Sequence, residues 1–130
     1  MLIDSSGWIE YLRGTGSATD AAVDALIRRD ASITTCQPVT MEVLAGGRSE
    51  SHTRQLERLL ARATLLQTEP TDWIDAARLY RTGRHRGLTV RKLVDCLIAA
   101  VALRNGEPML HNDADFDSIA QITTLVASRE

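Results

Sequence analysis

Aromatic residues, lysine and cysteine are scarce in this sequence of 130 residues, and no apolar run is long. Aromatic side chains make up only 4% of a chain that is 44% hydrophobic, so aliphatic side chains must build the core. Cys36 and Cys96 lie in separate apolar runs without metal-ligand spacing, which predicts small buried side chains rather than a zinc or disulfide framework. No apolar run reaches the ~18 residues of a membrane span, and Asp4 interrupts the first run, which argues against a signal peptide. We therefore expect a cytoplasmic protein.

Two common kinds of catalytic machinery are also missing. No Cys or His stands beside a partner that would activate it as a covalent nucleophile. No glycine-rich loop is present to hold the phosphates of a nucleotide. The formal net charge of -2 points by itself to no polyanionic partner. With this length and no repeat or linker, the sequence predicts one domain spanning residues 1–130.

Positive charge is concentrated in one segment of the chain. Between Ala76 and Val94 there is no acidic residue, and the segment leads directly to Asp95. A basic rim beside an acidic centre suits a phosphodiester substrate. A solvated helix face followed by a basic loop explains the pattern equally well. The candidate substrate contacts are the basic residues nearest Asp95, namely Arg84, Arg86, Arg91 and Lys92.

The order of apolar patterns predicts strands that alternate with helices. Strands are expected at 1–4, 31–35, 64–67, 108–111 and 122–126, the second followed by a break at Pro38. Helices are expected at 5–14, 18–29, 51–63, 91–105 and 113–120, the first ending at Gly14 and the one at 91–105 closed by Gly106. A short helix ends at Gly46-Gly47, and another begins at Pro70 with Trp73, Ile74, Ala77 and Tyr80 on one side. A basic loop is expected after it, from Gly83 to Thr89. This alternation is typical of a parallel α/β sheet with helices on both faces. Functional groups of such sheets collect at the carboxyl ends of the strands.

Asp95 is the most informative residue, because the segment 93–103 around it is otherwise apolar. The segment predicts a buried helix, and a carboxylate is almost never fully buried unless it is paired or bound to a metal. A salt bridge with Arg91, one turn earlier, is the best structural alternative.

Other acids follow predicted strand ends. Asp4 closes the first apolar run, Glu42 follows the second, and Asp113 and Asp115 follow the fourth strand. Asp4 also suits a helix N-cap and Glu42 the first turn of a helix, so both have a purely structural explanation. Asp117 is expected to be a plain surface charge.

A hard divalent cation would remove the repulsion among carboxylates brought together at this edge, and Mg²⁺ prefers oxygen ligands. A magnesium-bound water of lowered pKa attacks a phosphorus in line, which predicts phosphodiester hydrolysis. Ser6 is placed to hydrogen-bond a catalytic carboxylate or that water.

Four segments in order resemble the PIN-domain ribonucleases. They are LIDSSGWI (2–9), TMEVLAG (40–46), DCLIAA (95–100) and NDADF (112–116). Their spelling and the size of the chain are most similar to VapC toxins of type II toxin–antitoxin pairs, and the resemblance covers essentially the whole chain.

The resemblance implies a compact α/β sandwich and a Mg²⁺- or Mn²⁺-dependent endoribonuclease that cleaves structured RNA, commonly tRNA. It also implies a homodimer and a cognate VapB antitoxin whose C-terminal segment lies across the active-site groove. His111 departs from the pattern, because many relatives carry Thr or Ser there. The family's acidic site maps onto Asp4, Glu42, Asp95, Asp113 and Asp115, with Ser6 as the supporting hydroxyl and with Asp4, Asp95, Asp113 and Asp115 as metal ligands.

Two non-enzymatic hypotheses compete with this one. A phospho-acceptor signalling domain shares the size, the α/β pattern and the Mg²⁺-binding acids, but it needs a lysine on a late strand. The only lysine, Lys92, opens a predicted helix. The other is an inactive PIN-like module used for protein contacts, against which the complete set of acids argues.

Overall fold

The computed structural model describes residues 1–130 as a five-stranded parallel sheet with seven helices. The strand order is β3-β2-β1-β4-β5, and every neighbouring pair is parallel. The α/β fold with a mainly parallel sheet is therefore confirmed. In chain order the elements are β1 (Leu2–Ile3), α1 (Ser5–Arg13), α2 (Ala18–Arg28), β2 (Thr34–Cys36), α3 (Gln37–Ala45), α4 (Glu50–Leu60), β3 (Thr64–Leu66), α5 (Pro70–His85), α6 (Leu93–Asn105), β4 (Met109–Leu110), α7 (Ala114–Ile122) and β5 (Ala127–Ser128).

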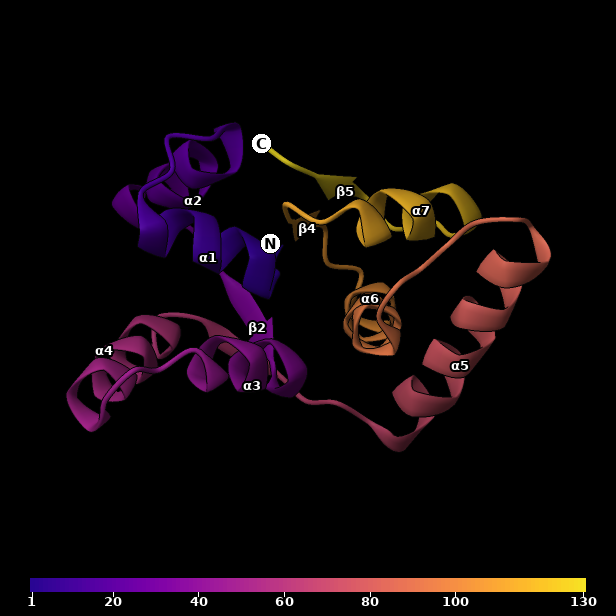
Figure 1. Ribbon diagram of the computed structural model, residues 1–130, viewed down its shortest axis with the longest axis horizontal. Coiled ribbons are helices and arrows are strands. Elements are labelled where there is room, and N and C mark those ends of the chain that lie inside the picture. Colours follow the sequence, from indigo (N-terminus) through magenta and orange to yellow (C-terminus); the bar gives the residue numbers. More distant parts are fainter.

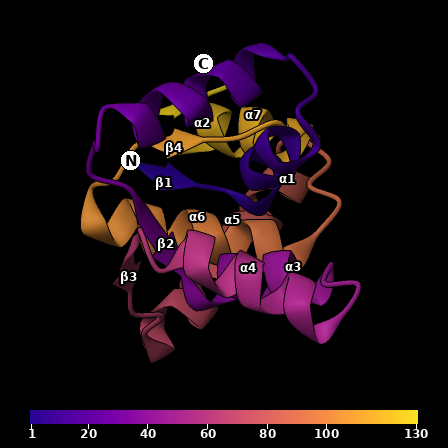
Figure 2. The ribbon, with the colours of Figure 1, turned by 90° about the vertical axis from the view of Figure 1, so that its left-hand side faces the viewer.

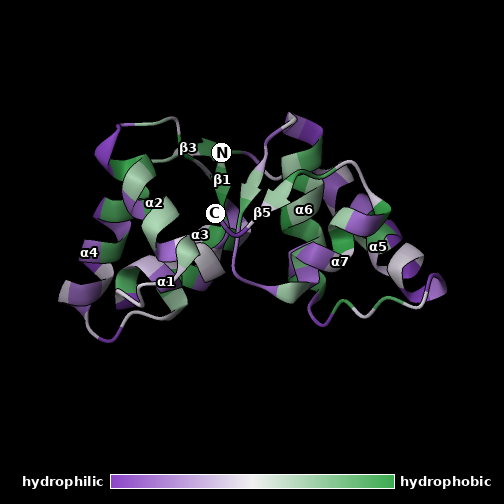
Figure 3. Ribbon diagram, turned by 90° about the horizontal axis from the view of Figure 1, so that it is seen from above, coloured by the Kyte–Doolittle hydropathy of each residue, from purple (hydrophilic) through white to green (hydrophobic).

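The helices form a layer on each side of the sheet. Helices α1 to α4 lie on one side and α5 to α7 on the other (Figures 1 and 3). Figure 2 faces the first of these layers, with the strands behind it. The chain runs from β1 outward to β3 and then returns to place β4 on the other side of β1. In a parallel sheet, the point between β1 and β4 where the direction reverses is the usual position of a functional crevice.

Helix α6 is the centre of the second layer. Its residues from Asp95 to Ala102 are all buried, and it packs between the sheet and α5 (Figure 1). A helix surrounded in this way needs apolar side chains on all sides, which Figure 3 shows as a nearly uniform hydrophobic colour. Both cysteines are buried and free, as predicted. None of the helices combines the length and hydrophobicity needed to cross a membrane.

Glycine ends two helices at the predicted positions. Gly14 after α1 has φ +58° and Gly106 after α6 has φ +64°. These left-handed conformations turn the chain back over the last carbonyls, and only glycine adopts them without steric cost. Gly106 thereby directs the chain from α6 into β4.

Several predicted boundaries are wrong. The segment 31–35 becomes a strand only at Thr34, because the chain first closes α2 with a bond from Ala31 N–H to the Leu26 carbonyl. Pro38 lies in the first turn of α3 and is not a break, since a missing N–H costs nothing there. Helix α5 extends through Gly83 to His85, into the predicted loop, and α6 begins two residues after Arg91.

The last strand, predicted at 122–126, also forms elsewhere. Helix α7 continues to Ile122 because Phe116, Ile119 and Ile122 follow helical spacing, and the strand forms only at Ala127–Ser128. A run of β-branched residues at 122–126 had favoured a strand there.

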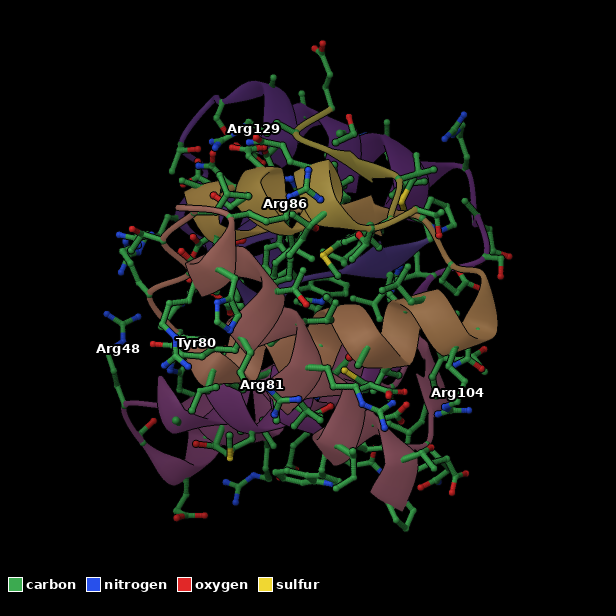
Figure 4. The ribbon with its side chains drawn as sticks, turned by 90° about the vertical axis from the view of Figure 1, so that its right-hand side faces the viewer. Arg48, Tyr80, Arg81, Arg86, Arg104 and Arg129 are labelled. Atoms are coloured by element: carbon green, nitrogen blue, oxygen red, sulfur yellow. The ribbon has the colours of Figure 1, made fainter.

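The buried face of α5 differs from the predicted one. Trp73 is 62% exposed and Ile74 58% exposed, whereas Asp72 and Ala76 face the core. The cause is an ion pair: the fully buried Asp72 accepts bonds of 2.9 Å from Nε and Nη2 of Arg104. Figure 4 shows Arg104 at the far end of α6. Burial alone would raise the pKa of Asp72, but Arg104 and the Glu69 backbone N–H hold it below its usual value.

This pair should be a principal tie between α5 and α6. We expect Arg104→Ala to lower the free energy of unfolding by about 2–3 kcal/mol, because it leaves a buried carboxylate without its cation. Arg78→Ala is the matched control, since Arg78 and Asp75 form an exposed pair on the same helix; it should cost less than about 0.5 kcal/mol. Urea denaturation measures both, and equal losses would contradict the assignment.

Candidate metal centre

The fold gathers five acidic side chains at the carboxyl edge of the sheet. They form two groups whose ligand oxygens lie within 4.8 Å of one another, and Asp95 belongs to both. The groups lie at the reversal between β1 and β4, because Asp4 directly follows β1 and the segment after β4 leads into α7. The first group is Asp4, Glu42 and Asp95, and the second is Asp95, Asp113 and Asp115.

Asp4 is the N-cap residue of α1 and also a member of the acidic cluster, so both roles that the sequence allowed are present. One oxygen, Oδ2, caps α1 by accepting from the Ser6 N–H at 2.9 Å and from the Ser6 hydroxyl at 2.6 Å. The other oxygen, Oδ1, is buried without a hydrogen-bond donor. Burial raises the pKa of Asp4 to about 6, although the bonds from Ser6 oppose this and the charge of Glu42 adds to it.

Hydroxyl groups at the start of α1 hold the first group in place. The Ser5 hydroxyl donates to Oε1 of Glu42 at 2.9 Å and so ties α1 to α3. The Ser6 oxygen also accepts the N–H of Asn112 at 2.9 Å, which joins Asp4 to the segment that precedes α7. The sequence indicated Ser6 as a supporting residue; Ser5 was missed, and its position beside Asp4 was the available signal.

Asp95 is the least compensated member. Its side chain is 1% exposed, and neither oxygen accepts a hydrogen bond. Burial raises its pKa to about 9, and the neighbouring carboxyls of Asp115, Asp4 and Asp113 contribute in the same direction. The salt bridge that the sequence suggested between Arg91 and Asp95 does not form, because the Arg91 guanidinium binds Asp113 and Asp115. The nearest cation to Asp95 is instead Lys92 Nζ, at 3.7 Å.

Asp113 and Asp115 have different surroundings. Asp115 accepts the backbone N–H groups of Arg91 and Lys92 at 3.0–3.1 Å and the Arg91 Nε–H at 3.3 Å, so both of its oxygens are occupied. Asp113 caps α7 through Oδ1, which also accepts from Arg91 Nη2 at 2.9 Å. Its Oδ2 contacts only Lys92 Nζ, at 3.2 Å. The pKa values of both lie below the usual range, because these donors, together with the neighbouring Asp95 carboxyl in the case of Asp115, outweigh burial.

His111 is buried and helps to position the segment that carries Asp113. It is fully buried against the Phe116 ring, and its Nδ1 accepts the N–H of Asp113 at 3.1 Å. Burial lowers its pKa. Asp117 is a surface charge, as expected: its side chain is 48% exposed, ion-pairs with Arg129 and lies 3.6 Å from His111 Nε2. Arg129 also donates to the Asn112 side chain at 2.7 Å, a tie that the sequence gave no reason to expect.

The four basic candidates divide into two pairs. Arg91 and Lys92 lie among the acids, whereas Arg84 and Arg86 are exposed at the end of α5 and just beyond it. Arg84 lies over the Tyr80 ring, 5.9 Å from its centre. Figure 4 shows Arg86 and Arg81 on the surface formed by α5 and the loop after it. Only the first pair is part of the acidic centre itself.

The donor set fits a hard divalent cation. Asp4 Oδ1 and both oxygens of Asp95 are buried carboxylate oxygens without a donor, and such groups are costly unless a cation compensates them. All ligand atoms within reach are carboxylate oxygens, as Mg²⁺ and Mn²⁺ prefer. The geometry therefore favours a metal centre built around Asp95.

The raised pKa of Asp95 gives a test of this burial in the presence of a chelator. Between its ordinary pKa of 3.8 and the raised value of about 9, the folded protein keeps a proton on Asp95 that the unfolded chain releases. The free energy of unfolding should therefore fall as pH rises from 7 to 8, by up to about 1.4 kcal/mol over that pH unit. Asp4 and His111 titrate below this window. Burial raises the pKa of Cys36 to about 12 and of Cys96 to about 11, so the unfolded chain releases these protons only above it.

Asp95→Asn should flatten this dependence, and Asp75→Asn, at an exposed position on α5, should keep it. Chemical denaturation at each pH measures the slopes. A wild-type protein whose stability does not fall between pH 7 and 8 would show that Asp95 is not held as the geometry indicates.

Comparisons with known proteins agree with this geometry. The family model described as "PIN domain" matches residues 1–122. The chain is 44% identical over 130 residues to "Ribonuclease VapC11" of Mycobacterium tuberculosis, with 98% of this chain and 97% of the relative covered.

Two solved structures share the fold. VapBC2 from Rickettsia felis, bound to a promoter DNA fragment, has a TM-score of 0.77 at 15% identity, covering 98% of this chain and 96% of that chain. DNA-bound VapBC from Salmonella typhimurium has a TM-score of 0.78 at 15% identity, covering 98% and 95%. The chain therefore belongs to the PIN-domain family and, within it, to the VapC ribonucleases.

Proposed function

We propose that residues 1–130 form a single catalytic unit, a Mg²⁺- or Mn²⁺-dependent endoribonuclease that acts as a toxin on structured RNA such as tRNA. The observation that carries the proposal is Asp95, a buried carboxylate without a donor that is shared by two acidic groups. The relative VapC11 is described as a ribonuclease, which supports RNA as the substrate class.

We assign Asp4, Asp95 and Asp113 as the residues that hold the cation. Asp4 and Asp95 offer buried oxygens without donors, and Asp113 Oδ2 contacts only the Lys92 ammonium. Asp115 was expected among the ligands, but its oxygens already accept the backbone of Arg91 and Lys92. We therefore assign it a positioning role at the start of α6, which fixes where Asp95 stands.

The remaining residues of the centre suit the handling of a proton and a phosphate. When bound, a divalent cation supplies a water of lowered pKa and neutralises charge on the phosphodiester. The Ser5 hydroxyl orients Glu42 through Oε1 and leaves Oε2 available to accept the proton that the water loses. Ser6 holds Asp4 and Asn112 in register across the site.

We propose a VapB-type antitoxin and a second copy of the chain as partners. The structures from R. felis and S. typhimurium are toxin–antitoxin complexes with the same fold. A groove between α1, α3 and α4 leads to Glu42, and its lining includes the apolar Ile9 and Leu12; we place the antitoxin segment there. Exposed Met41, Trp73 and Leu93 line another hollow, which a homodimer would cover.

The signalling alternative gains no support from the structure. A phospho-acceptor domain requires a lysine on a late strand, whereas Lys92 is the N-cap residue of α6.

Removal of either buried carboxylate should abolish cleavage. We expect purified protein to cleave total tRNA into discrete fragments with Mg²⁺ or Mn²⁺. The cleavage rates of Asp4→Asn and of Asp95→Asn should each be below about 1% of the wild-type rate. Asp75→Asn, with the same chemical change on an exposed side chain, should cleave normally. Cleavage that persists in EDTA, or in both site variants while they remain folded, would refute the metal-dependent mechanism.

The exposed arginines should affect RNA binding and not chemistry. Arg84→Gln and Arg86→Gln each remove a positive charge without touching the acidic centre. We expect KM to rise about three- to tenfold with kcat nearly unchanged, and the salt dependence of binding to become weaker, because fewer phosphates are neutralised. Arg28→Gln on α2, on the other side of the sheet, is the control. A fall in kcat at unchanged KM would argue against a role in binding.

A further inference from the structure

Lys92 stands where a cation is needed. Its ammonium lies 3.2 Å from Asp113 Oδ2 and 3.7 Å from Asp95 Oδ2, so it contacts two of the three carboxylates assigned above to the metal. It is also the only lysine in the chain. In the absence of a metal ion, this ammonium is the positive charge that the acidic centre has closest to Asp95.

The backbone conformation just before α6 places the Lys92 side chain at the acidic centre. Asp115 accepts the N–H groups of both Arg91 and Lys92, which fixes the segment just before α6. Lys92 is the N-cap residue of α6 with an extended backbone, φ -123° and ψ 122°. The position of the Lys92 side chain is therefore set by the same carboxylate that sets the start of the Asp95 helix.

The Lys92 ammonium can move out of the acidic centre into solvent, whereas the carboxylates are buried and cannot. The Lys92 side chain is 47% exposed, whereas Asp95 is 1% and Asp113 10% exposed. A flexible four-carbon stem with a strongly hydrated end group can turn into solvent at little cost. Arg91 is held more firmly, because its guanidinium binds both Asp113 and Asp115 and its N–H binds Asp115.

We propose that Lys92 is a built-in counter-cation: its ammonium occupies the acidic centre of the metal-free protein and must be displaced from Asp113 and Asp95 when a divalent cation binds. The inference rests on the metal centre of the proposed function. Two cations cannot share the same carboxylate oxygens at these distances without strong repulsion in a partly buried site. Binding of the metal therefore includes the cost of moving Lys92, and the intrinsic affinity of the acids is higher than the affinity that the protein displays.

Calorimetric titration with Mg²⁺ and with Mn²⁺ tests the proposal on the full chain. Lys92→Gln removes the charge and keeps most of the stem, and we expect it to bind either cation roughly five- to twentyfold more tightly than wild type. Lys92→Arg keeps the charge and should stay close to wild type. Arg81→Gln removes a charge from an exposed position on α5 and should change the dissociation constant less than about twofold, because screening weakens distant charges.

Direct observation of Lys92 provides the second readout. Because the chain has one lysine, selective ¹⁵Nζ labelling gives a single side-chain ammonium signal. This signal should shift during a Mg²⁺ titration, with the midpoint found by calorimetry for the wild-type protein.

The outcomes separate this inference from the function on which it rests. If the cations bind and Lys92→Gln does not tighten binding, or if the Lys92 signal stays unchanged at saturation, the counter-cation role is refuted while the metal centre stands. If neither wild type nor Lys92→Gln binds Mg²⁺ or Mn²⁺, the metal centre fails and this inference fails with it.

Discussion

The structure depends on one electrostatic constraint, the burial of the Asp95 carboxyl group among other carboxyl groups. Its oxygens have no hydrogen-bond donor, and the Lys92 ammonium approaches only to 3.7 Å. Burying this group opposes folding, whether it carries its charge or keeps the proton that it holds below pH 9, so the rest of the fold must hold it in place. Helix α6 does so by burying apolar residues on every side. The stability of α6 offsets the cost of holding the Asp95 carboxyl group in a fixed, buried position.

The topology brings the other acids to the same point. Asp4 follows β1, and the segment after β4 carries Asp113, so the two strands at the reversal deliver one acid each. Hydroxyl and amide groups then set the spacing: Ser6 joins Asp4 to Asn112, and Asp115 anchors the backbone just before α6. The centre is thus assembled by short hydrogen bonds between segments far apart in the sequence, and a cation would replace repulsion among them with attraction.

Much of this arrangement could be predicted from the sequence, for identifiable reasons. Alternating apolar patterns predicted the parallel α/β sheet, and Gly14 and Gly106 predicted two helix ends. An acid in an apolar segment singled out Asp95. What failed depended on tertiary contacts. The apolar Trp73 faces solvent because the polar Asp72 is needed inside to meet Arg104. The partners of Arg91 could not be chosen, because Asp113 and Asp115 approach it only in the folded chain.

The most direct test of the account is a crystal structure with Mn²⁺, using its anomalous scattering to locate the ion. We predict one anomalous peak bounded by carboxylate oxygens of Asp4, Asp95 and Asp113, about 2.0–2.3 Å from each. A second ion would not alter the argument, provided that Asp95 is a ligand. Full occupancy of Mn²⁺ elsewhere, with the oxygens of Asp95 still without a cation, would contradict the claim that this buried carboxylate is kept in order to bind metal.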